Sequence, residues 1–376
     1  MCPKNVYLDN AASTFPHKEV VKKMSELYCE NIGNPSSIHF FGRKSKVLLE
    51  EARKTIADLL KAPVLSIYFT SSATEANNLI IQSYLKKTNK KHIITSTLEH
   101  PSVKHCIERS RAGAKVHYVD INEKGHIDLD HLDKLTSENP GSLVVLMHAN
   151  NEISNLLKMN KTAAICEKNK ALFFSDMVQT IGHYEVDMSS VPVHFASASA
   201  HKFHGPKGAG FLYCSPEVFD LIPLMVGGAQ ERNLRPGTEN VEGIAGMALA
   251  LSLSLKNIRE KQTYVSGLKK MMVHGLRNIH DAFQFIGDSA ENGHYGILSV
   301  QFPETKAGDM LLNYLDMNGI AASAGSACSS GSQKRSHVMD ALNIARNKQV
   351  VRFSFSPCNT KKEVEYCLNV IYKLLH

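Results

Sequence analysis

The stretch that decides the fold covers residues 197–210 and reads SASAHKFHGPKGAG, with Lys202 near its middle. Residues 193–197, VHFAS, alternate in polarity and predict a short strand. Residues 205–208, GPKG, are typical of a turn. Lys202 is therefore expected where a strand ends and a glycine-rich loop begins. The small side chains of residues 198–200 leave room beside it for a bulky group.

A lysine in this position suits a Schiff base with a carbonyl cofactor, which is the usual role of the lysine in pyridoxal 5'-phosphate (PLP) enzymes. On this segment alone, a surface lysine in a polar loop is an equally good interpretation, because a motif needs its structural context. Other stretches of the chain supply that context.

Composition narrows the class of protein. The chain has 376 residues and is 43% hydrophobic, which is enough for a buried core and favours two or three domains. The net charge of +7 is spread along the chain, so we expect no nucleic-acid partner. An excess of basic over acidic residues favours an acidic protein partner or a phosphorylated cofactor.

The eight cysteines contain no CxxC pair, so no metal site is predicted from them. No apolar signal core follows Met1, and no apolar run is long enough to cross a membrane. We therefore expect a soluble, cytoplasmic protein with free thiols, without a membrane partner.

Apolar runs that alternate with helical segments predict an α/β fold with a mostly parallel sheet. The predicted strands cover residues 66–70, 92–95, 115–119, 143–147 and 172–174. Ligands bind beyond the carboxyl ends of the strands in such sheets. Polar candidates fall at several of these ends, namely residues 70–74, Asn151, Asp176 and residues 199–202.

Two of these candidates carry alternative interpretations. Residues 71–78 open a helix with small hydroxylated side chains, which suits phosphate binding but equally suits a capping box of Ser72 and Glu75. Asp176 follows an apolar strand, so a cationic partner such as a protonated pyridine nitrogen would stabilise it, with Gln179 one turn further on. A helix N-cap at Asp176 is the more common alternative.

The second half of the chain changes pattern. Residues 227–240 are rich in glycine, carry two arginines and predict an anion-contacting loop or a flexible surface loop. Residues 241–262 predict one helix that links two domains. A half-buried strand at 297–302, further helices and a strand at 350–355 indicate a smaller α+β domain. We expect a large domain of residues 15–250 and a small one of residues 1–14 with 251–376.

Three single residues stand out in loops or strands. Cys328 lies among tiny and hydroxylated residues, which are typical of a mobile exposed loop, so its thiol could travel to a substrate. A surface cysteine without a function is not favoured, because an exposed free thiol is a liability. Arg352 lies between apolar residues of a strand, where an ion pair is favoured over a substrate carboxylate. Asn34 lies in a Gly- and Pro-flanked loop, where a plain turn is favoured.

Taken together, these motifs resemble the NifS/IscS-type cysteine desulfurases of the long-loop subgroup over nearly the full length of the chain. The segments that carry the resemblance are residues 70–78, 99–100, 150–152, 176–179, 199–210, 227–240 and 324–332. The resemblance implies a fold-type I PLP-dependent enzyme that is a homodimer with sites at the subunit interface.

The resemblance also implies a role for each cofactor residue. Lys202 would hold PLP and shuttle protons, Asp176 would pair with the pyridinium nitrogen, and His100 would stack on the ring. Asn151 and Gln179 would bond the ring hydroxyl. The phosphate would be bound by Ala73, Thr74, Ser199 and His201, joined by Thr238 of the partner subunit.

The implied substrate is L-cysteine, whose carboxylate Asn34 and Arg352 would clamp. Cys328 would attack the substrate sulfur and keep it as a persulfide while alanine leaves. A sulfur-acceptor protein, for example an iron–sulfur scaffold, would then serve iron–sulfur cluster, thio-cofactor or tRNA biosynthesis. A cation near the working position of Cys328 is expected, because the thiol must ionise near neutral pH.

Some residues depart from the family pattern, notably Asn233, Leu234 and residues 180–183. The chain also ends soon after its last helix, without a longer tail for scaffold docking. Alternative functions are a selenocysteine lyase or another PLP-dependent aminotransferase-like enzyme, a non-catalytic scaffold, and a metal protein. A mobile cysteine speaks against the aminotransferase, and the absence of close ligand pairs speaks against the metal protein.

Overall fold

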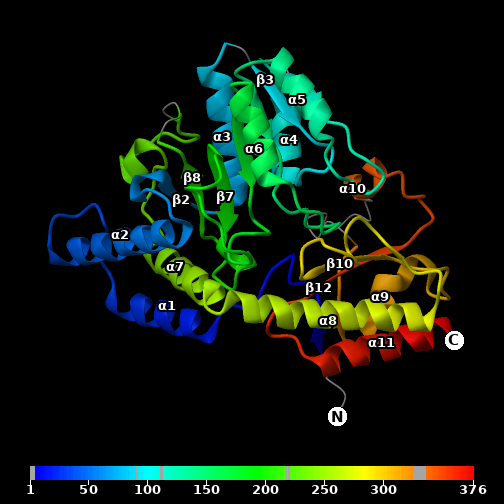
Figure 1. Ribbon diagram of the computed structural model, residues 1–376. Coiled ribbons are helices and arrows are strands. Elements are labelled where there is room, and N and C mark those ends of the chain that lie inside the picture. The colour runs from blue at the N-terminus through cyan, green and yellow to red at the C-terminus, as the bar shows by residue number, and fades with distance from the viewer. Residues whose placement is uncertain (1–4, 90, 111–112, 217, 219–220, 325–335) are drawn as a thin grey trace.

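The computed structural model describes residues 5–89, 91–110, 113–216, 218, 221–324 and 336–376. Within these residues, a seven-stranded sheet has the order β2-β8-β7-β6-β5-β3-β4 (Figure 1). Its strands are β2 (Ile67–Thr70), β3 (His92–Thr95), β4 (Lys115–Tyr118), β5 (Leu143–Val145), β6 (Leu172–Asp176), β7 (Phe195–Ser199) and β8 (Gly210–Cys214). The neighbours from β7 to β4 run parallel, whereas β8 is antiparallel to both β7 and β2. The predicted mostly parallel α/β sheet is confirmed.

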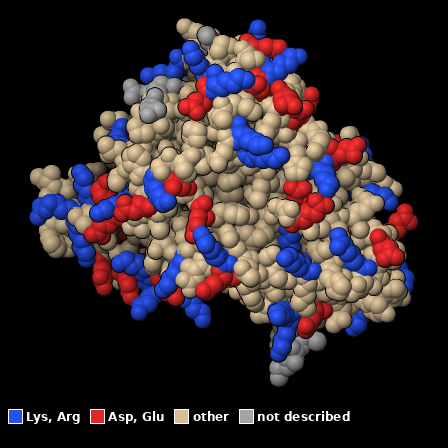
Figure 2. All heavy atoms as spheres, viewed as in Figure 1, with Lys and Arg blue, Asp and Glu red and all other residues tan. Residues whose placement is uncertain are grey.

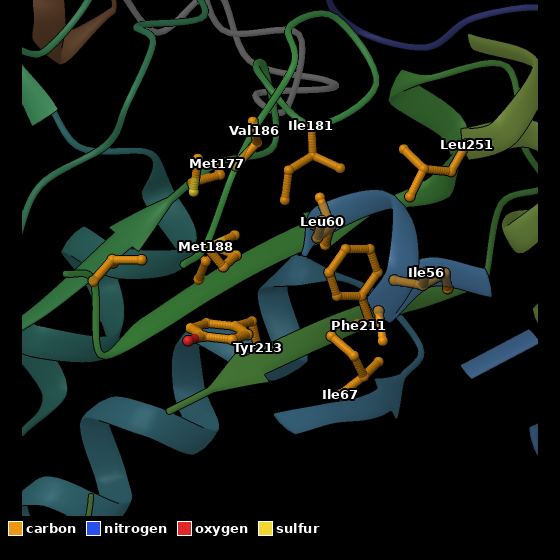
Figure 3. Close-up of a cluster of buried hydrophobic side chains, with 14 of the residues drawn as sticks. Ile56, Leu60, Ile67, Met177, Ile181, Val186, Met188, Phe211, Tyr213 and Leu251 are labelled. Carbon is orange, nitrogen blue, oxygen red and sulfur yellow. The ribbon is translucent and has the colours of Figure 1, made fainter. Parts of the chain in front are cut away.

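Helices cover both faces of this sheet, so its central strands are buried on both sides. One face packs against α3 (Ala73–Lys87) and α4 (Pro101–Arg109). The other packs against α2 (Phe40–Leu60), α5 (Leu129–Glu138), α6 (Met159–Lys168) and α7 (Val241–Leu255). Figure 3 shows part of this second core, where Phe211 and Ile67 of the sheet meet Ile56 and Leu60 of α2. The two layers of helices leave the strand ends free to form a site.

A second body of structure has its own sheet and core. In the described residues, β9 (Gln284–Phe285), β10 (Ile297–Gln301) and β12 (Val350–Ser354) form an antiparallel sheet, and β1 (Val6–Tyr7) pairs with β11 (Ile320–Ala321). Its core packs against α8 (Ile258–Ile279), α9 (Leu311–Met317) and α11 (Lys361–Leu375). The remaining helices are α1 (Lys18–Glu30) and α10 (His337–Ala341). The exact limits of the two predicted domains stay a prediction.

The predicted helix over residues 241–262 is wrong as a single element. α7 ends at Leu255 and α8 begins at Ile258, with a bend of 75° between their axes. The break follows from Asn257, which has the left-handed φ of 54° and so cannot continue a helix. α8 then runs along the smaller sheet (Figure 1).

The strand over residues 297–302 was expected to be half-buried, and this expectation is also wrong. All five residues of β10 are buried. Leu298 and Val300 enter the smaller core, while the backbone N–H of Ser299 donates to Ser289 Oγ at 3.0 Å. The segment around Ser289 therefore covers the side of β10 that the alternating sequence pattern predicted to face solvent.

The surface carries charges of both signs. On the face shown in Figure 2, Lys and Arg side chains are interspersed with Asp and Glu. No single helix of the described residues is long and apolar enough to cross a membrane, although the bent pair α7 and α8 passes such a test together by length and composition.

Candidate active site

A cavity of about 280 Å³ lies where the carboxyl ends of the large-sheet strands meet β12. Ten residues that were singled out from the sequence line this cavity. They are Ala73, Thr74, His100, Asn151, Asp176, Gln179, Ser199, His201, Lys202 and Arg352. The remaining lining residues are Ala11, Ala12, Ser72, Ser102, Met147, Ala149 and Val178. The topology therefore brings together residues that are up to 341 positions apart in the chain, from Ala11 to Arg352.

Lys202 ends a short 3-10 turn, Ala200–Lys202, that follows β7 directly. Its Nζ donates to the carbonyl oxygens of Ala11 at 2.7 Å and Ala12 at 2.8 Å. These two carbonyls hold the amine at the wall of the cavity. Sequence reasoning missed residues 11 and 12, because backbone carbonyls act here and alanine side chains give no signal for it.

Asp176 is the last residue of β6 and is only 6% exposed. Its Oδ2 accepts from the Asn77 amide at 2.9 Å, and its Oδ1 accepts from the backbone N–H of Val178 at 3.1 Å. No helix begins after Asp176, so the N-cap interpretation is wrong. Asp176 is a buried carboxyl at the cavity wall, and its hydrogen bonds from Asn77 and Val178 come from neutral donors, so it suits a cationic ligand atom.

His100 caps α4 and presents its ring to the cavity. Its Nδ1 accepts from the backbone N–H of Ser102 at 3.2 Å and lies 2.8 Å from Ser102 Oγ. Burial lowers the pKa of His100 and outweighs the opposing effect of Asp176. The ring is therefore neutral near pH 7 and is oriented by its own helix, which suits contact with a flat aromatic ligand.

The N-terminus of α3 forms another part of the wall, with Ala73 and Thr74 exposed to the cavity. Ser72 accepts from the N–H of Glu75 at 3.4 Å, so half of the predicted capping box is present. The Glu75 carboxylate does not return to Ser72 and instead binds the N–H and hydroxyl of Ser71. The free end of a helix dipole next to Ser199 can hold a phosphate.

Arg352 is 1% exposed and forms the ion pair favoured from sequence, with Asp9 Oδ1 at 2.7 Å. Its Nη1 donates to the carbonyl oxygen of Asn151 at 2.9 Å. Its buried Nε has no hydrogen-bond partner among the residues that the structure describes. Because Arg352 also lines the cavity, its positive charge can act on an anionic ligand there.

Some predicted site residues do not line the cavity of this chain. Asn34 is exposed, and its Oδ1 accepts from the N–H of Ser36 at 2.9 Å. Thr238 is exposed on its loop and lies outside the cavity lining, where the resemblance assigned it to the other subunit. Cys328 lies outside the described residues. The roles of these three residues stay predictions.

The two arginines of residues 227–240, for which an anion-contacting loop was one interpretation, both contact groups of the large domain. Arg235 Nε pairs with Glu75 Oε1 at 3.0 Å. Arg232 donates to the carbonyl oxygen of Ile67 and lies 3.9 Å above the ring of Tyr68. Both guanidinium groups therefore attach the loop to the large domain instead of serving a ligand. Among the described residues, no group of three His, Cys, Asp or Glu side chains is placed to hold a metal.

The α/β fold and the cavity at the strand ends are typical of an enzyme. Comparison with known families identifies which family the chain belongs to. The model of the family described as aminotransferase class-V matches residues 6–367, and the chain belongs to this family, among the NifS/IscS-type cysteine desulfurases.

Individual relatives cover nearly the whole chain. The chain is 36% identical to cysteine desulfurase IscS of Dictyoglomus turgidum, over 99% of this chain and 95% of the relative. It is 36% identical to cysteine desulfurase NifS of Azotobacter vinelandii, over 96% of this chain and 90% of the relative. A solved NifS-like protein is 35% identical and superposes with a TM-score of 0.90, over 98% of both chains.

Proposed function

We propose that this protein is a PLP-dependent cysteine desulfurase that converts L-cysteine to L-alanine and keeps the sulfur as a persulfide on Cys328. One observation carries the proposal furthest: Lys202, Asp176 and Arg352 line a single cavity. The family and its curated relatives agree with this activity.

The residues present fit PLP. The Lys202 amine is held at the cavity wall, Asp176 offers a buried carboxyl to a ring nitrogen, and the N-terminus of α3 offers the positive end of its helix dipole to a phosphate. When bound, PLP supplies an electron sink that weakens the bonds at the substrate Cα and Cβ. Asn151, Gln179 and His100 would complete its surroundings.

The protein groups have separate tasks in the reaction. Arg352 lines the cavity and orients the substrate carboxylate through the charge of its guanidinium group. Lys202 moves a proton at Cα, and the carbonyls of Ala11 and Ala12 hold its amine before and after that transfer. His100 remains neutral, so it can contact an aromatic ring without adding charge.

Sulfur transfer balances without an external oxidant. The Cys328 thiolate attacks the substrate sulfur, an S–S bond forms, and the C–S bond of the substrate breaks. The electron pair of that bond stays on the substrate Cβ, which takes a proton to become the methyl group of alanine. Cys328 must therefore be reduced at the start of each cycle, which supports the predicted cytoplasmic setting.

We also propose that the protein works as a homodimer. Large apolar side chains are exposed near α2 and just before residues 227–240, where burial against a partner would remove them from water. Ile32 is 78% exposed, Ile38 90% and Val226 97%. A second copy of the chain that covers these residues would bring the Thr238 loop toward its neighbour's cavity. The sulfur would then pass to an acceptor protein, for which an iron–sulfur scaffold is our first candidate.

An assay of the purified protein with PLP tests the activity. We expect a visible absorbance band, and equal amounts of sulfide and alanine from L-cysteine with a thiol reductant. Cys328→Ala should keep the band and lose sulfide formation. A band without sulfide in the wild type would contradict the desulfurase and favour an aminotransferase. A much higher rate with L-selenocysteine, with no sulfide from L-cysteine, would favour the lyase.

A further inference from the structure

His183 lies between the lysine segment and residues that follow α7 in the chain. Its Nε2 is 2.9 Å from the carbonyl oxygen of Lys202, and its Nδ1 is 3.1 Å from the hydroxyl oxygen of Tyr295. Its backbone carbonyl accepts from Gln262 Nε2 of α8 at 2.7 Å. His183 is not among the residues that line the cavity, so it reaches the site only through the backbone of Lys202.

The partners of His183 determine its tautomer. Burial, with a smaller effect of the Lys202 charge, lowers the pKa of His183 to about 4, so the ring is neutral near pH 7 and has one N–H. A carbonyl oxygen can only accept, so the N–H is on Nε2 and donates to Lys202. Nδ1 is then the acceptor, and the Tyr295 hydroxyl donates to it. A directional chain of two hydrogen bonds results.

A glycine lets this loop approach the lysine segment. Gly182 has a φ of +81°, and a Cβ built there would lie 2.3 Å from the Cβ of Phe203, the residue after Lys202. Any side chain at position 182 would push the loop away from Lys202.

The other end of the chain of bonds is firmly anchored. Tyr295 precedes β10, which pairs with β12, the strand that carries Arg352. The carbonyl oxygen of the neighbouring His294 accepts from Lys269 Nζ of α8 at 2.9 Å. The aromatic rings of His294 and Tyr295 stack at 4.8 Å between centroids. The segment that holds His183 is thus tied to both the strand and the helix of the smaller core.

We propose that His183, held by Tyr295, is a positioning residue that fixes the backbone of Lys202 relative to the strand of Arg352. The inference rests on the proposed function, in which Lys202 holds the cofactor and moves a proton. Without the hydrogen bond from His183, a part-buried carbonyl loses a donor and the turn Ala200–Lys202 can shift. A shift of about 1 Å lowers a rate on the order of 100-fold.

Four variants of the full chain test this role. His183→Phe keeps a ring but removes both hydrogen bonds, whereas His183→Gln keeps an N–H donor and an oxygen acceptor. Tyr295→Phe removes only the hydroxyl. The matched control is His274→Phe on α8, because His274 is exposed and its ring makes an exposed hydrogen bond with Asn278 on its own helix. For each variant, the affinity for PLP is measured by absorbance titration of the cofactor-free protein, and kcat and KM by alanine formation from L-cysteine.

For His183→Phe we expect about a 10-fold weaker PLP affinity and about a 10-fold lower kcat, with KM within about twofold because Arg352 is untouched. His183→Gln should stay within about threefold of the wild type, and Tyr295→Phe should lose about threefold. The double variant His183→Phe/Tyr295→Phe should be no worse than His183→Phe, because both act through one contact.

Two results would overturn the inference. One is a wild-type PLP affinity and kcat in His183→Phe; the other is an equal loss in His183→Gln and His183→Phe, which would assign the effect to packing. The proposed function can fail independently of this inference. If the wild type binds PLP but forms no alanine, the desulfurase activity is contradicted, and the PLP affinities of the variants still test the role of His183. A wild type that shows no absorbance band with PLP overturns both.

Discussion

Two buried carboxyl groups near the cavity differ in their hydrogen bonds. Asp176 has both oxygens occupied, by the Asn77 amide and by the N–H of Val178. Glu99 is 1% exposed; its Oε1 accepts from Ser96 Oγ and from a backbone N–H, while its Oε2 has no partner in the described part of the chain. Asp176 lines the cavity and Glu99 does not, so Asp176 suits a ligand contact and Glu99 a structural role.

Removing the negative charge of Asp176 should weaken the site. We expect Asp176→Asn to lower both PLP affinity and kcat about 10- to 100-fold, because a charged hydrogen bond to the ring nitrogen would be lost. Absorbance titration and alanine formation measure the two effects. The control Asp187→Asn changes a carboxylate that pairs with the exposed Lys61 and should leave both unchanged. Wild-type values for Asp176→Asn would contradict the assigned role.

The buried Glu99 carboxyl should make the free energy of unfolding depend on pH. Burial raises its pKa from 4.5 to about 8, so the folded protein holds a proton that the unfolded chain releases above pH 4.5. The free energy of unfolding therefore falls as pH rises from 4.5 to 8 through this group. We expect Glu99→Gln to lack this loss and to gain on the order of 1–3 kcal/mol over the wild type between pH 5 and pH 8. Urea unfolding at both pH values measures the difference; a difference that does not change with pH would exclude a protonated Glu99.

At the scale of elements, one ion pair fixes the loop of residues 227–240 to α2 and β2. Arg53 binds both carboxylate oxygens of Glu231 at 2.7 and 2.8 Å, and the N–H of Phe69 donates to the same carboxylate at 2.7 Å. Glu231 and the next two residues all have positive φ, from 46° to 66°. The loop therefore depends on this pair to keep an unfavourable backbone conformation.

Breaking that pair should destabilise the protein. We expect Arg53→Met to lower the free energy of unfolding by about 3–5 kcal/mol, because it leaves a buried carboxylate without its cation. The double variant Arg53→Met/Glu231→Leu should lose less than Arg53→Met alone. Lys61→Met, which breaks an exposed pair with Asp187, serves as the control and should cost at most about 1 kcal/mol. Chemical unfolding measures all three, and equal losses for Arg53→Met and Lys61→Met would contradict the argument.

At the scale of the whole molecule, the exposed apolar side chains are unevenly placed. Ile38 and Val226 are almost fully exposed in segments that flank α2 and residues 227–240. Arg232 ties this loop to the chain before β2 by donating to the carbonyl oxygen of Leu65. In the homodimer that we propose, a second copy of the chain would cover this surface.

We expect Ile38→Asp/Val226→Asp to convert a dimer into a monomer, because buried charges at an interface are costly. Light scattering after gel filtration gives the mass. Met317→Asp is the matched control, because Met317 is 86% exposed but lies on α9. The monomer should also bind PLP more weakly if Thr238 of the partner subunit contributes to the phosphate site. A dimer that survives both aspartates would move the interface elsewhere.

Much of this site could be predicted from the sequence, because it depends on the chemistry of single side chains. Lys202, Asp176 and Arg352 are unusual residue types for their apolar or small surroundings, and parallel strands collect their carboxyl ends at one edge. Most of the ten lining residues were singled out at such strand ends, whereas His100 was assigned by the family resemblance and Arg352 lies in β12 of the smaller, antiparallel sheet. The mostly parallel sheet was predictable for the same reason, since alternating strands and helices allow few arrangements.

The tertiary structure alone decided what depends on backbone atoms and on distant contacts. The carbonyls of Ala11 and Ala12 hold the Lys202 amine, yet alanine has no side-chain signature for that role. The bond from His183 to the Lys202 carbonyl needs a glycine turn and a tyrosine more than 100 positions away. Sequence thus determined which chemical groups are available, because these are properties of single residues. Which groups meet is a property of packing, because it depends on the paths of several segments at once.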